Sequence, residues 1–355
     1  MRKVERIDPI TVDALALRDA LARALDGGPA LSLAPISHQS VPDEIALLIL
    51  TGGTTGAAKL VALSADAMRA SASLSNRALG ADSRDRWSLS LPLHHIAGIN
   101  QLLRSIDLQN DPVKSGGEFI SVVPTQLYRA IAKQSKELEE LRNAKKVLIG
   151  GAAVPDNLLR QGRDLGIPLV TSYGMTEMCG GCVYNGEPLP GVEVKILTSG
   201  QIALKGPMQA TGYFDNAVAT QESFIDGWFI TSDQGVINKD GSLEVVGRFD
   251  DVIISGGEKI SPRAISEILG VFFPDEEIYV LGIPDTEWGQ SVRVVLKTSS
   301  LSQKFTLKEC REKISQSLGK VAAPRSLLLL SEIPLKSNGK VDNALLAQMP
   351  ATEQV

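Results

Sequence analysis

Residues 45–59 read Ile45-Ala46-Leu47-Leu48-Ile49-Leu50 followed by Thr51-Gly52-Gly53-Thr54-Thr55-Gly56-Ala57-Ala58-Lys59. The apolar run predicts a buried strand, and the residues after it predict a flexible loop that ends in a lysine. Glycines let backbone N–H groups turn toward an anion, threonine hydroxyls add donors, and Lys59 adds a positive charge. The stretch therefore favours phosphate binding.

A Walker A loop is the obvious alternative for this stretch. That motif requires Gly, four residues and then Gly-Lys-Ser/Thr. Here Lys59 follows Ala57-Ala58 and precedes Leu60, so the motif is absent. Because Gly/Thr clusters also form ordinary turns, the loop becomes diagnostic only together with motifs further along the chain.

Length and charge limit the class of protein. A chain of 355 residues is expected to form at least two domains. A net charge of −5 and a pI near 5.4 give no electrostatic signature of a nucleic-acid partner. The N-terminus has mixed charges and leads to no signal sequence, and no apolar run approaches the length of a membrane span. We expect a soluble cytoplasmic protein.

Three cysteines are too few for a disulfide framework. Cys179 and Cys182 form a C-x-x-C pair, but no second pair or histidine cluster accompanies them, and Cys310 lies far away. We interpret them as small buried or pocket-lining residues and not as a zinc or redox site.

The order of apolar runs predicts the fold class. A helix is expected at 12–25, and strands at 45–50, 88–91, 120–123, 147–149 and 169–171 alternate with helical segments such as 124–140, which indicates a parallel sheet. Short β runs follow at 192–197, 201–205, 228–231 and 243–246, with a hairpin signal at 238–241. The rest alternates strands (278–283, 291–297, 326–330) with a helix at 307–318. We predict an α/β protein: a large N-terminal domain with mostly parallel sheets plus a β-rich subdomain, and a small mobile α+β C-terminal domain.

Two further motifs follow predicted parallel strands, where α/β sheets bind ligands. They are Gly150-Gly151-Ala152 and Ser172-Tyr173-Gly174-Met175-Thr176-Glu177. A glycine pair lets a flat base lie against the backbone, and Tyr173 offers an aromatic face. Thr176 offers a hydroxyl, and Glu177 offers a hard oxygen ligand suited to Mg²⁺ on a nucleotide.

The remaining motifs lie in the second half of the chain. Asp233 is placed where a carboxylate could hold a ribose diol. The run Gly247-Arg248-Phe249-Asp250-Asp251 ends the β-rich region, and Ser255-Gly256-Gly257-Glu258-Lys259 predicts a mobile glycine loop. Lys340 projects from a turn near the end of the chain.

Taken in this order, the motifs resemble the adenylate-forming acyl-CoA synthetase superfamily over about residues 45–345. The resemblance implies ATP, Mg²⁺ and coenzyme A as ligands and an acid–thiol ligase activity with two half-reactions. It implies that Glu177 binds Mg²⁺, that Thr176 contacts phosphate, that Asp250 is the hinge between domains 1–249 and 251–355, and that Lys340 stabilises charge during adenylation. The implied nucleotide and thiol site comprises Thr51, Gly53, Thr54, Thr55, Gly56, Lys59, Gly150, Gly151, Ala152, Tyr173, Gly174, Asp233, Arg248, Gly256 and Gly257.

The chain departs from the superfamily pattern at its beginning. Gly52 stands where Ser is usual, and Ala57-Ala58 replace the common Lys-Pro, so we expect a weaker grip on phosphate. Only about fifty residues precede the loop, where such enzymes usually carry a longer subdomain. We expect a shortened form in which part of the acyl-pocket wall is missing or comes from a partner subunit. The oligomeric state stays open, a homo-oligomer included.

The acid substrate is indicated by Leu91-Pro92-Leu93-His94-His95-Ile96-Ala97-Gly98, which resembles the family segment whose second histidine closes the acyl pocket. Arg104 follows in an apolar and amidic segment and could pair with a distal carboxylate. The alternatives are a core histidine at His95 and a surface charge at Arg104. Residues 121–127, 172–177 and 253–258 resemble the o-succinylbenzoate-CoA ligases of menaquinone synthesis. That resemblance implies Ser172 as a substrate contact and room for a ring at Gly150, Gly180 and Gly181.

Other activities remain open at this point. A CoA ligase for another aryl or fatty acid would leave Arg104 facing solvent. A standalone adenylation module would load a carrier protein and would not need free CoA. A non-catalytic nucleotide-binding member would be expected to lack Lys340 or Glu177, and both are present.

Overall fold

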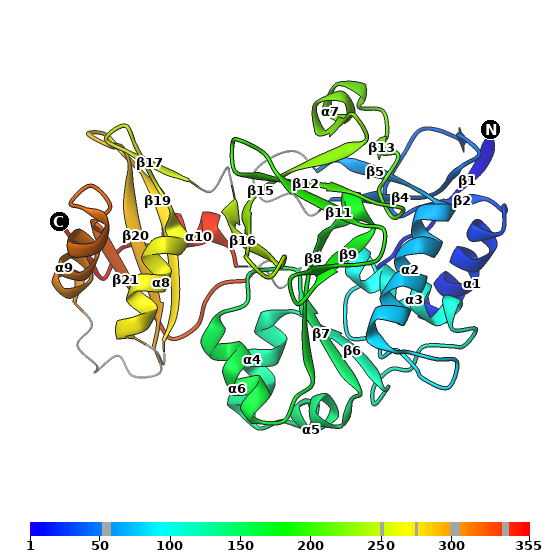
Figure 1. The fold of residues 1–355 in the computed structure, drawn as a ribbon, viewed down its shortest axis with the longest axis horizontal. Coiled ribbons are helices and arrows are strands. Elements are labelled where there is room, and N and C mark those ends of the chain that lie inside the picture. Colours follow the sequence, from blue (N-terminus) through cyan, green and yellow to red (C-terminus); the bar gives the residue numbers. More distant parts are fainter. Residues whose placement is uncertain (52–57, 249–251, 274–275, 299–305, 336–340) are drawn as a thin grey trace. The chain divides into compact units, whose positions relative to one another are not determined.

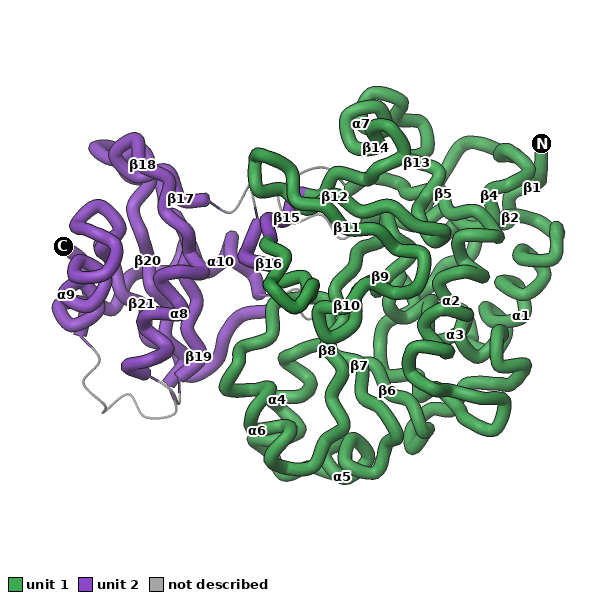
Figure 2. The backbone as a smooth tube through the Cα atoms, viewed as in Figure 1, with its two compact units in different colours: residues 1–231, 236–244 green, residues 232–235, 245–355 purple. Residues whose placement is uncertain are grey.

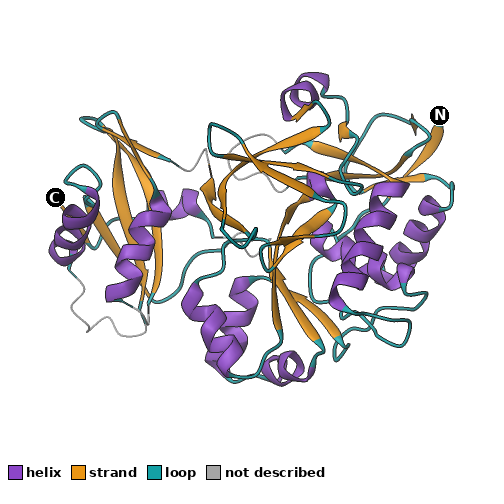
Figure 3. Cartoon of the chain, in the orientation of Figure 1, coloured by secondary structure: helices purple, strands orange, loops and turns teal. Residues whose placement is uncertain are grey.

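The computed structural model describes residues 1–51, 58–248, 252–273, 276–298, 306–335 and 341–355. They form two compact units, which Figure 2 colours separately. Unit 1 comprises residues 1–231 and 236–244, and unit 2 comprises residues 232–235 and 245–355. Both units combine sheets with helices (Figure 3), which confirms the mixed α/β class.

The first sheet of unit 1 contains the predicted strand at 45–50. Strand β4 spans Ile45–Leu50, and its first five residues are buried, as suits a central strand covered on both faces. It runs parallel to β2 and antiparallel to β5. The strand order is β13-β5-β4-β2-β1-β3, with bounds β1 Arg2–Arg6, β2 Ala30–Ser32, β3 Ser40–Val41, β5 Leu60–Ser64 and β13 Gly212–Tyr213.

Helices α1 (Ala14–Leu25) and α2 (Ala65–Leu79) contact this sheet (Figure 1), and α3 (Ile96–Asp107) packs on both helices and on β9 of the second sheet. Helix α2 begins where the Ser64 hydroxyl accepts the Ala67 N–H, and it ends at left-handed Gly80. It contacts β5 of the first sheet and β9 of the second. Helix α2 therefore lies between the two sheets.

The second sheet has the order β10-β9-β8-β7-β6. Strands β6, β7 and β8 are parallel, as the alternating pattern predicts, whereas β9 is antiparallel to β8. Helices α4 to α6 share a core with this sheet. The bounds are β6 Phe119–Val122, β7 Lys146–Gly150, β8 Leu169–Met175, β9 Gly180–Tyr184, β10 Glu187–Pro188, α4 Pro124–Lys133, α5 Lys136–Asn143, α6 Asp156–Asp164 and the 3₁₀ turn η1 Thr176–Met178.

Three predicted details differ from the structure. The helix expected at 124–140 is interrupted at Gln134, whose left-handed φ of 47° cannot continue a right-handed helix. The strand expected at 88–91 is replaced by isolated bridges of Trp87 and Ser88. The sheets are mixed and not mostly parallel, because β5 and β9 each run antiparallel to a central strand.

The β-rich part follows the predicted runs closely. Its strand order is β11-β12-β15-β14, and β16 pairs with β15. The predicted hairpin at 238–241 joins β15 to β16, and Asn238 N–H donates to the Ser242 carbonyl at 2.9 Å. The bounds are β11 Glu193–Ile196, β12 Gln201–Lys205, α7 Ala217–Ser223, β14 Phe224–Ile225, β15 Trp228–Ile237 and β16 Leu243–Arg248.

Strands β17 to β22 of unit 2 form a sheet of order β18-β17-β20-β21-β22, with β19 paired to β20. Helices α8 and α9 share a core with it, and the Thr306–Glu309 capping box begins α9 at its predicted start. The bounds are β17 Ile253–Ser255, β18 Glu258–Ile260, α8 Pro262–Phe272, β19 Glu277–Asp285, β20 Gly289–Lys297, α9 Leu307–Leu318, β21 Ser326–Leu330, α10 Asn343–Gln348 and β22 Glu353–Gln354.

Candidate active site

Two predicted nucleotide motifs meet at the carboxyl ends of neighbouring parallel strands. Gly150 at the end of β7 is the Cα partner of Ser172 on β8. A Cβ on Gly150 would lie 2.6 Å from the Ser172 carbonyl oxygen, so only glycine fits there. Gly151 follows with φ +83°, a conformation that favours glycine. The pairing brings residues 150–152 and 172–174, which include Ala152, Tyr173 and Gly174, to one edge of the sheet.

The glycines next to this edge are required by close packing. A Cβ on Gly174 would overlap the Gly180 carbonyl, and a Cβ on Gly180 would overlap Asn100 Nδ2. A Cβ on Gly181 would overlap Ser172 Oγ. Side chains of the protein thus fill the Cβ direction of Gly180 and Gly181, and the expectation that these glycines leave room for a flat ring stays a prediction.

The turn that carries Thr176 and Glu177 is η1, directly after β8. It ends at Cys179, whose φ of 49° is left-handed. The Cys179 carbonyl accepts hydrogen bonds from Ser71 Oγ at 2.9 Å and from Asn100 Nδ2 at 2.8 Å. Since these donors stand on α2 and α3, two helices fix the backbone that presents Glu177.

Tyr213 contacts this turn and was not identified from the sequence. Its hydroxyl donates to Glu177 Oε1 at 2.8 Å, and Lys59 Nζ lies 4.5 Å from its ring centroid. Burial, and then the nearby Glu177 charge, raise the pKa of Tyr213 well above its usual value, so the phenol remains a hydrogen-bond donor. Tyr213 thus connects the lysine of the phosphate loop with the predicted magnesium ligand.

The predicted phosphate loop is flanked by the paired strands β4 and β5. Thr51 N–H donates to the Lys59 carbonyl at 2.8 Å, and Lys59 N–H donates to Thr51 Oγ1 at 3.1 Å. The predicted site residues Gly53, Thr54, Thr55, Gly56, Asp250 and Lys340 lie outside the described residues.

Helix α3 carries both residues predicted to meet the acid. His95 precedes its first turn, half-buried, with its ring centroid 4.1 Å from that of His94. Arg104 in the last turn is only 3% exposed, so the surface-charge alternative is wrong.

The Arg104 guanidinium lies 4.6 Å from the Trp87 ring centroid, and its Nη atoms reach Ser121 Oγ at 3.5 Å and Tyr184 Oη at 3.3 Å. Its Nε meets no hydrogen-bond acceptor among the described residues. Within the part of the chain that the structure describes, no carboxylate forms an ion pair with Arg104. A buried cation therefore faces two hydroxyls and an aromatic ring.

The other predicted residues belong to unit 2. Asp233 and Arg248 lie half-buried on the paired strands β15 and β16. Gly256 and Gly257 form the two-residue turn between β17 and β18, with φ of 56° and 85°. Both values suit a type I′ turn, so the predicted glycine loop is a tight hairpin.

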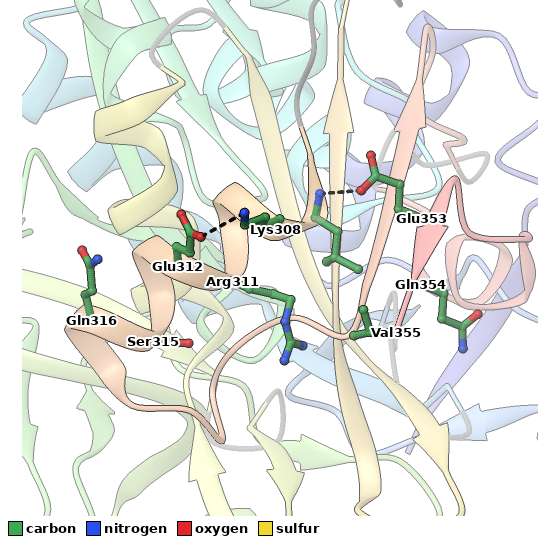
Figure 4. A pocket seen from close by; sticks show the side chains of 9 residues that line it. Lys308, Arg311, Glu312, Ser315, Gln316, Glu353, Gln354 and Val355 are labelled. Carbon is green, nitrogen blue, oxygen red and sulfur yellow. Dashed lines mark hydrogen bonds and ion pairs between the residues drawn. The ribbon is translucent and has the colours of Figure 1, made fainter.

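A cationic hollow of about 170 Å³ adjoins this hairpin. Gly256 N–H donates to the Trp288 carbonyl at 3.0 Å, and the Arg325 guanidinium lies 4.5 Å from the Trp288 ring centroid. Arg311 and Lys320 also line it. A wider hollow of about 710 Å³, shown in Figure 4, lies along α9 and β22 and has mixed charge, including the Lys308–Glu312 pair.

The cysteines behave as predicted for small buried side chains. Burial raises the pKa of Cys179 and of Cys182 to about 12, so both remain protonated thiols at neutral pH. Within the described ranges, no cluster of three metal-binding side chains exists, and no helix is long and apolar enough to cross a membrane. Glu177 nevertheless fits Mg²⁺ carried by a nucleotide, because that ion commonly takes one or two carboxylates and completes its shell with phosphates and water.

Known proteins match the chain along most of its length. The model of the AMP-binding enzyme family matches residues 3–106 and 110–214, and the model of the AMP-binding enzyme C-terminal domain matches residues 276–340. A probable 2-succinylbenzoate–CoA ligase of Mycobacterium tuberculosis is 34% identical over 95% of this chain and 96% of its own.

Solved structures agree with these matches. An o-succinylbenzoate CoA synthetase from Bacillus subtilis in complex with the acyl-adenylate intermediate OSB-AMP has a TM-score of 0.75 and 25% identity, covering 99% of this chain and 84% of that one. The same enzyme in complex with ATP and magnesium ion has a TM-score of 0.70 and 26% identity, covering 92% and 80%. The match to the family models and the similarity to these relatives show that this chain belongs to the AMP-binding enzyme family.

Proposed function

We propose that this chain catalyses the ATP-dependent conversion of 2-succinylbenzoate and coenzyme A to 2-succinylbenzoyl-CoA, AMP and pyrophosphate. It would act in the cytoplasm as an AMP-forming acid–thiol ligase of menaquinone biosynthesis. The names of its relatives and the ligands of the solved structures support the reaction class and the acid.

The choice of acid rests on the burial of the Arg104 side chain, which is 3% exposed. Its buried guanidinium has no ion partner among the residues that the structure describes, and such a charge is costly unless a ligand neutralises it. A monocarboxylic aryl or fatty acid has one carboxylate, and adenylation consumes it. 2-Succinylbenzoate has a second carboxylate, which could pair with Arg104 while the first reacts. The same argument disfavours a carrier-loading module for a simple acid.

Adenylation requires stabilisation of the charge that develops on the phosphates. The attacking carboxylate oxygen forms a bond to the α-phosphorus as the bond to pyrophosphate breaks. Lys59, the donors of residues 51–56 and the Thr176 hydroxyl would hold the phosphates, and Lys340 would approach the reacting oxygens. Glu177 would hold Mg²⁺, which supplies Lewis-acid neutralisation of phosphate charge. Asp233 and Arg248 would bind the ribose.

Thioester formation needs the CoA thiolate to reach the acyl carbon and displace AMP. We place Gly256 and Gly257 beside the pantetheine arm, since a Cβ on Gly257 would meet no atom within 4 Å. The hollow of Trp288, Arg311, Lys320 and Arg325 would bind phosphates of CoA. A hinge at Asp250 would exchange Lys340 for the glycine hairpin between the two steps.

The test is a screen for acyl-AMP formation, followed by mass spectrometry. The panel contains 2-succinylbenzoate, benzoate, phthalate, a phenylalkanoate and a medium-chain fatty acid. We expect the acyl-adenylate with 2-succinylbenzoate and its conversion to the thioester when CoA is added. A faster reaction with a monoacid would overturn the assignment of substrate, and no adenylate with any acid would overturn the activity.

A further inference from the structure

The segment around Tyr213 is attached to both halves of the predicted phosphate site. Tyr213 is the antiparallel partner of Val61, and Phe214 N–H donates to the Leu60 carbonyl at 2.7 Å, so β13 lies against the strand that begins just after Lys59. At its other end, Ala210 N–H donates to the Glu177 carbonyl at 2.8 Å. Backbone hydrogen bonds therefore fix Tyr213 relative to both side chains that it contacts.

The side chain of Tyr213 is also restrained from behind. It is 7% exposed, and its ring packs edge-to-face on Phe224 with centroids 5.7 Å apart. Tyr213 N–H donates to Thr220 Oγ1 at 2.9 Å. A ring held in this way can act as a fixed support for a mobile lysine side chain and a flexible carboxylate.

We propose that Tyr213 is a positioning residue with two separable roles: its hydroxyl orients Glu177 toward Mg²⁺, and its ring holds Lys59 toward the phosphates of ATP. This inference rests on the proposed function and deepens it. The hydroxyl contacts Glu177 Oε1 at 2.8 Å, and hydrogen bonds to a metal-binding carboxylate commonly set metal affinity. Lys59 Nζ lies 4.5 Å from the centroid of the Tyr213 ring, and this cation–π contact restricts the lysine side chain before ATP binds.

Two variants separate the roles. Tyr213→Phe removes the hydroxyl and keeps the ring, and Tyr213→Leu removes both. Equilibrium binding of ATP is measured by calorimetry, once in EDTA and once across a Mg²⁺ titration. Loss of the hydroxyl should raise the Mg²⁺ concentration needed for half-maximal enhancement of ATP binding by roughly tenfold in both variants. Loss of the ring should weaken ATP binding in EDTA by roughly threefold, in Tyr213→Leu only.

A lysine variant provides the matched control. Lys59→Met should weaken ATP binding in EDTA, and adding Tyr213→Leu to it should cause no further loss in EDTA, because the ring acts through the lysine. A purely structural role of Tyr213 predicts instead that the losses add and that Mg²⁺ dependence is unchanged. The KM for the acid should stay within about twofold in Tyr213→Phe.

Tyr213→Phe preserves packing, so it tests the role of the hydroxyl even if Tyr213→Leu fails to fold. In that case Lys59→Met tests the role of the ring, because unchanged ATP binding in EDTA would show that there is no lysine contribution for the ring to support. Wild-type Mg²⁺ dependence in Tyr213→Phe would overturn the role of the hydroxyl. Equal ATP affinity of the Phe and Leu variants in EDTA would overturn the role of the ring. Failure of the proposed function is distinguishable, since it appears as absent acyl-adenylate in the wild-type protein while ATP and Mg²⁺ binding still report on Tyr213.

Discussion

Replacing Arg104 by methionine tests the choice of acid most directly. Methionine retains an unbranched stem beside Trp87 and removes the charge. Two unit charges about 4 Å apart attract by about 4 kcal/mol at an effective dielectric constant near 20, and breaking a buried pair costs a similar amount. In the free protein Arg104 makes weak contacts with Ser121 and Tyr184, which offset part of this attraction. We therefore expect the binding free energy of 2-succinylbenzoate to weaken by about 2–4 kcal/mol, which raises its KM roughly 30- to 700-fold.

The assay follows pyrophosphate release with 2-succinylbenzoate and with benzoate as the monoacid. The wild-type protein should have a higher kcat/KM for 2-succinylbenzoate than for benzoate, and Arg104→Met should lose this preference. The KM for ATP and the rate with benzoate should stay nearly constant. Arg84→Met is the control, because that arginine is exposed and pairs only locally with Asp82. Its preference between the two acids should equal that of the wild-type protein.

Stability gives an independent check of the same reasoning. Since none of the carboxylates among the described residues pairs with the buried Arg104, Arg104→Met should unfold at the same or a higher temperature when no ligand is present. Added 2-succinylbenzoate should raise the melting temperature of the wild-type protein more than that of the variant. An unchanged diacid preference, or ligand stabilisation equal in both proteins, would refute the pairing and favour a ligase for a simple acid.

Four other predictions concern different parts of the chain. Lys340→Ala should slow adenylation by roughly 10² to 10³ yet spare thiol transfer from a supplied acyl-adenylate, whereas Gly257→Leu should do the reverse; equal loss in both half-reactions would exclude the domain exchange. Trp288→Ala should raise the KM for CoA and leave acyl-AMP formation intact, which steady-state kinetics with each substrate would check. Urea denaturation should show that Gly174→Ala lowers the unfolding free energy by about 3 kcal/mol, because the added Cβ overlaps Gly180. Gly270→Ala should raise it by about 0.5–1 kcal/mol, because Gly270 lies on α8 and an added Cβ meets open space. Burial raises the pKa of Cys182 to about 12, so the folded state binds the thiol proton more tightly than the unfolded state does. The resulting contribution to stability is present below pH 9 and is lost as the pH rises toward 12. Over that pH range, the unfolding free energy of Cys182→Ala should therefore fall less steeply than that of the wild-type protein.

Local pattern predicted the elements best. Strands β12 and β21 and helix α9 have the bounds that their apolar periods indicate, because short local signals settle them. The break at Gln134 was missed because nothing in a run of good helix formers marks a left-handed residue. Antiparallel pairing of β9 with β8 was missed because strand direction depends on the tight connection through η1.

The candidate site was predictable where its residues cluster in sequence. The motifs at 150–152 and 172–177 lie together because they follow adjacent parallel strands. Tyr213 was not predictable, since its contacts depend on pairing between β5 and β13, which lie far apart in the sequence. The run Gly212-Tyr213-Phe214, which follows the turn residues Gly206-Pro207, was a weak local signal. The burial of Arg104 likewise depends on α3 packing against β9, and helix periodicity alone left it undecided.

The reciprocal hydrogen bonds between Thr51 and Lys59 have a consequence for how this enzyme can change over time. Thr51 and Lys59 are joined to each other beside the paired strands β4 and β5, so the distance between the two ends of the predicted loop is set by the sheet. Even a doubling of the loop's length would cost only about 0.6 kcal/mol in closure entropy. Because its length is cheap to change, the stretch between Thr51 and Lys59 is a suitable place for testing insertions when the enzyme is engineered toward other phosphate donors.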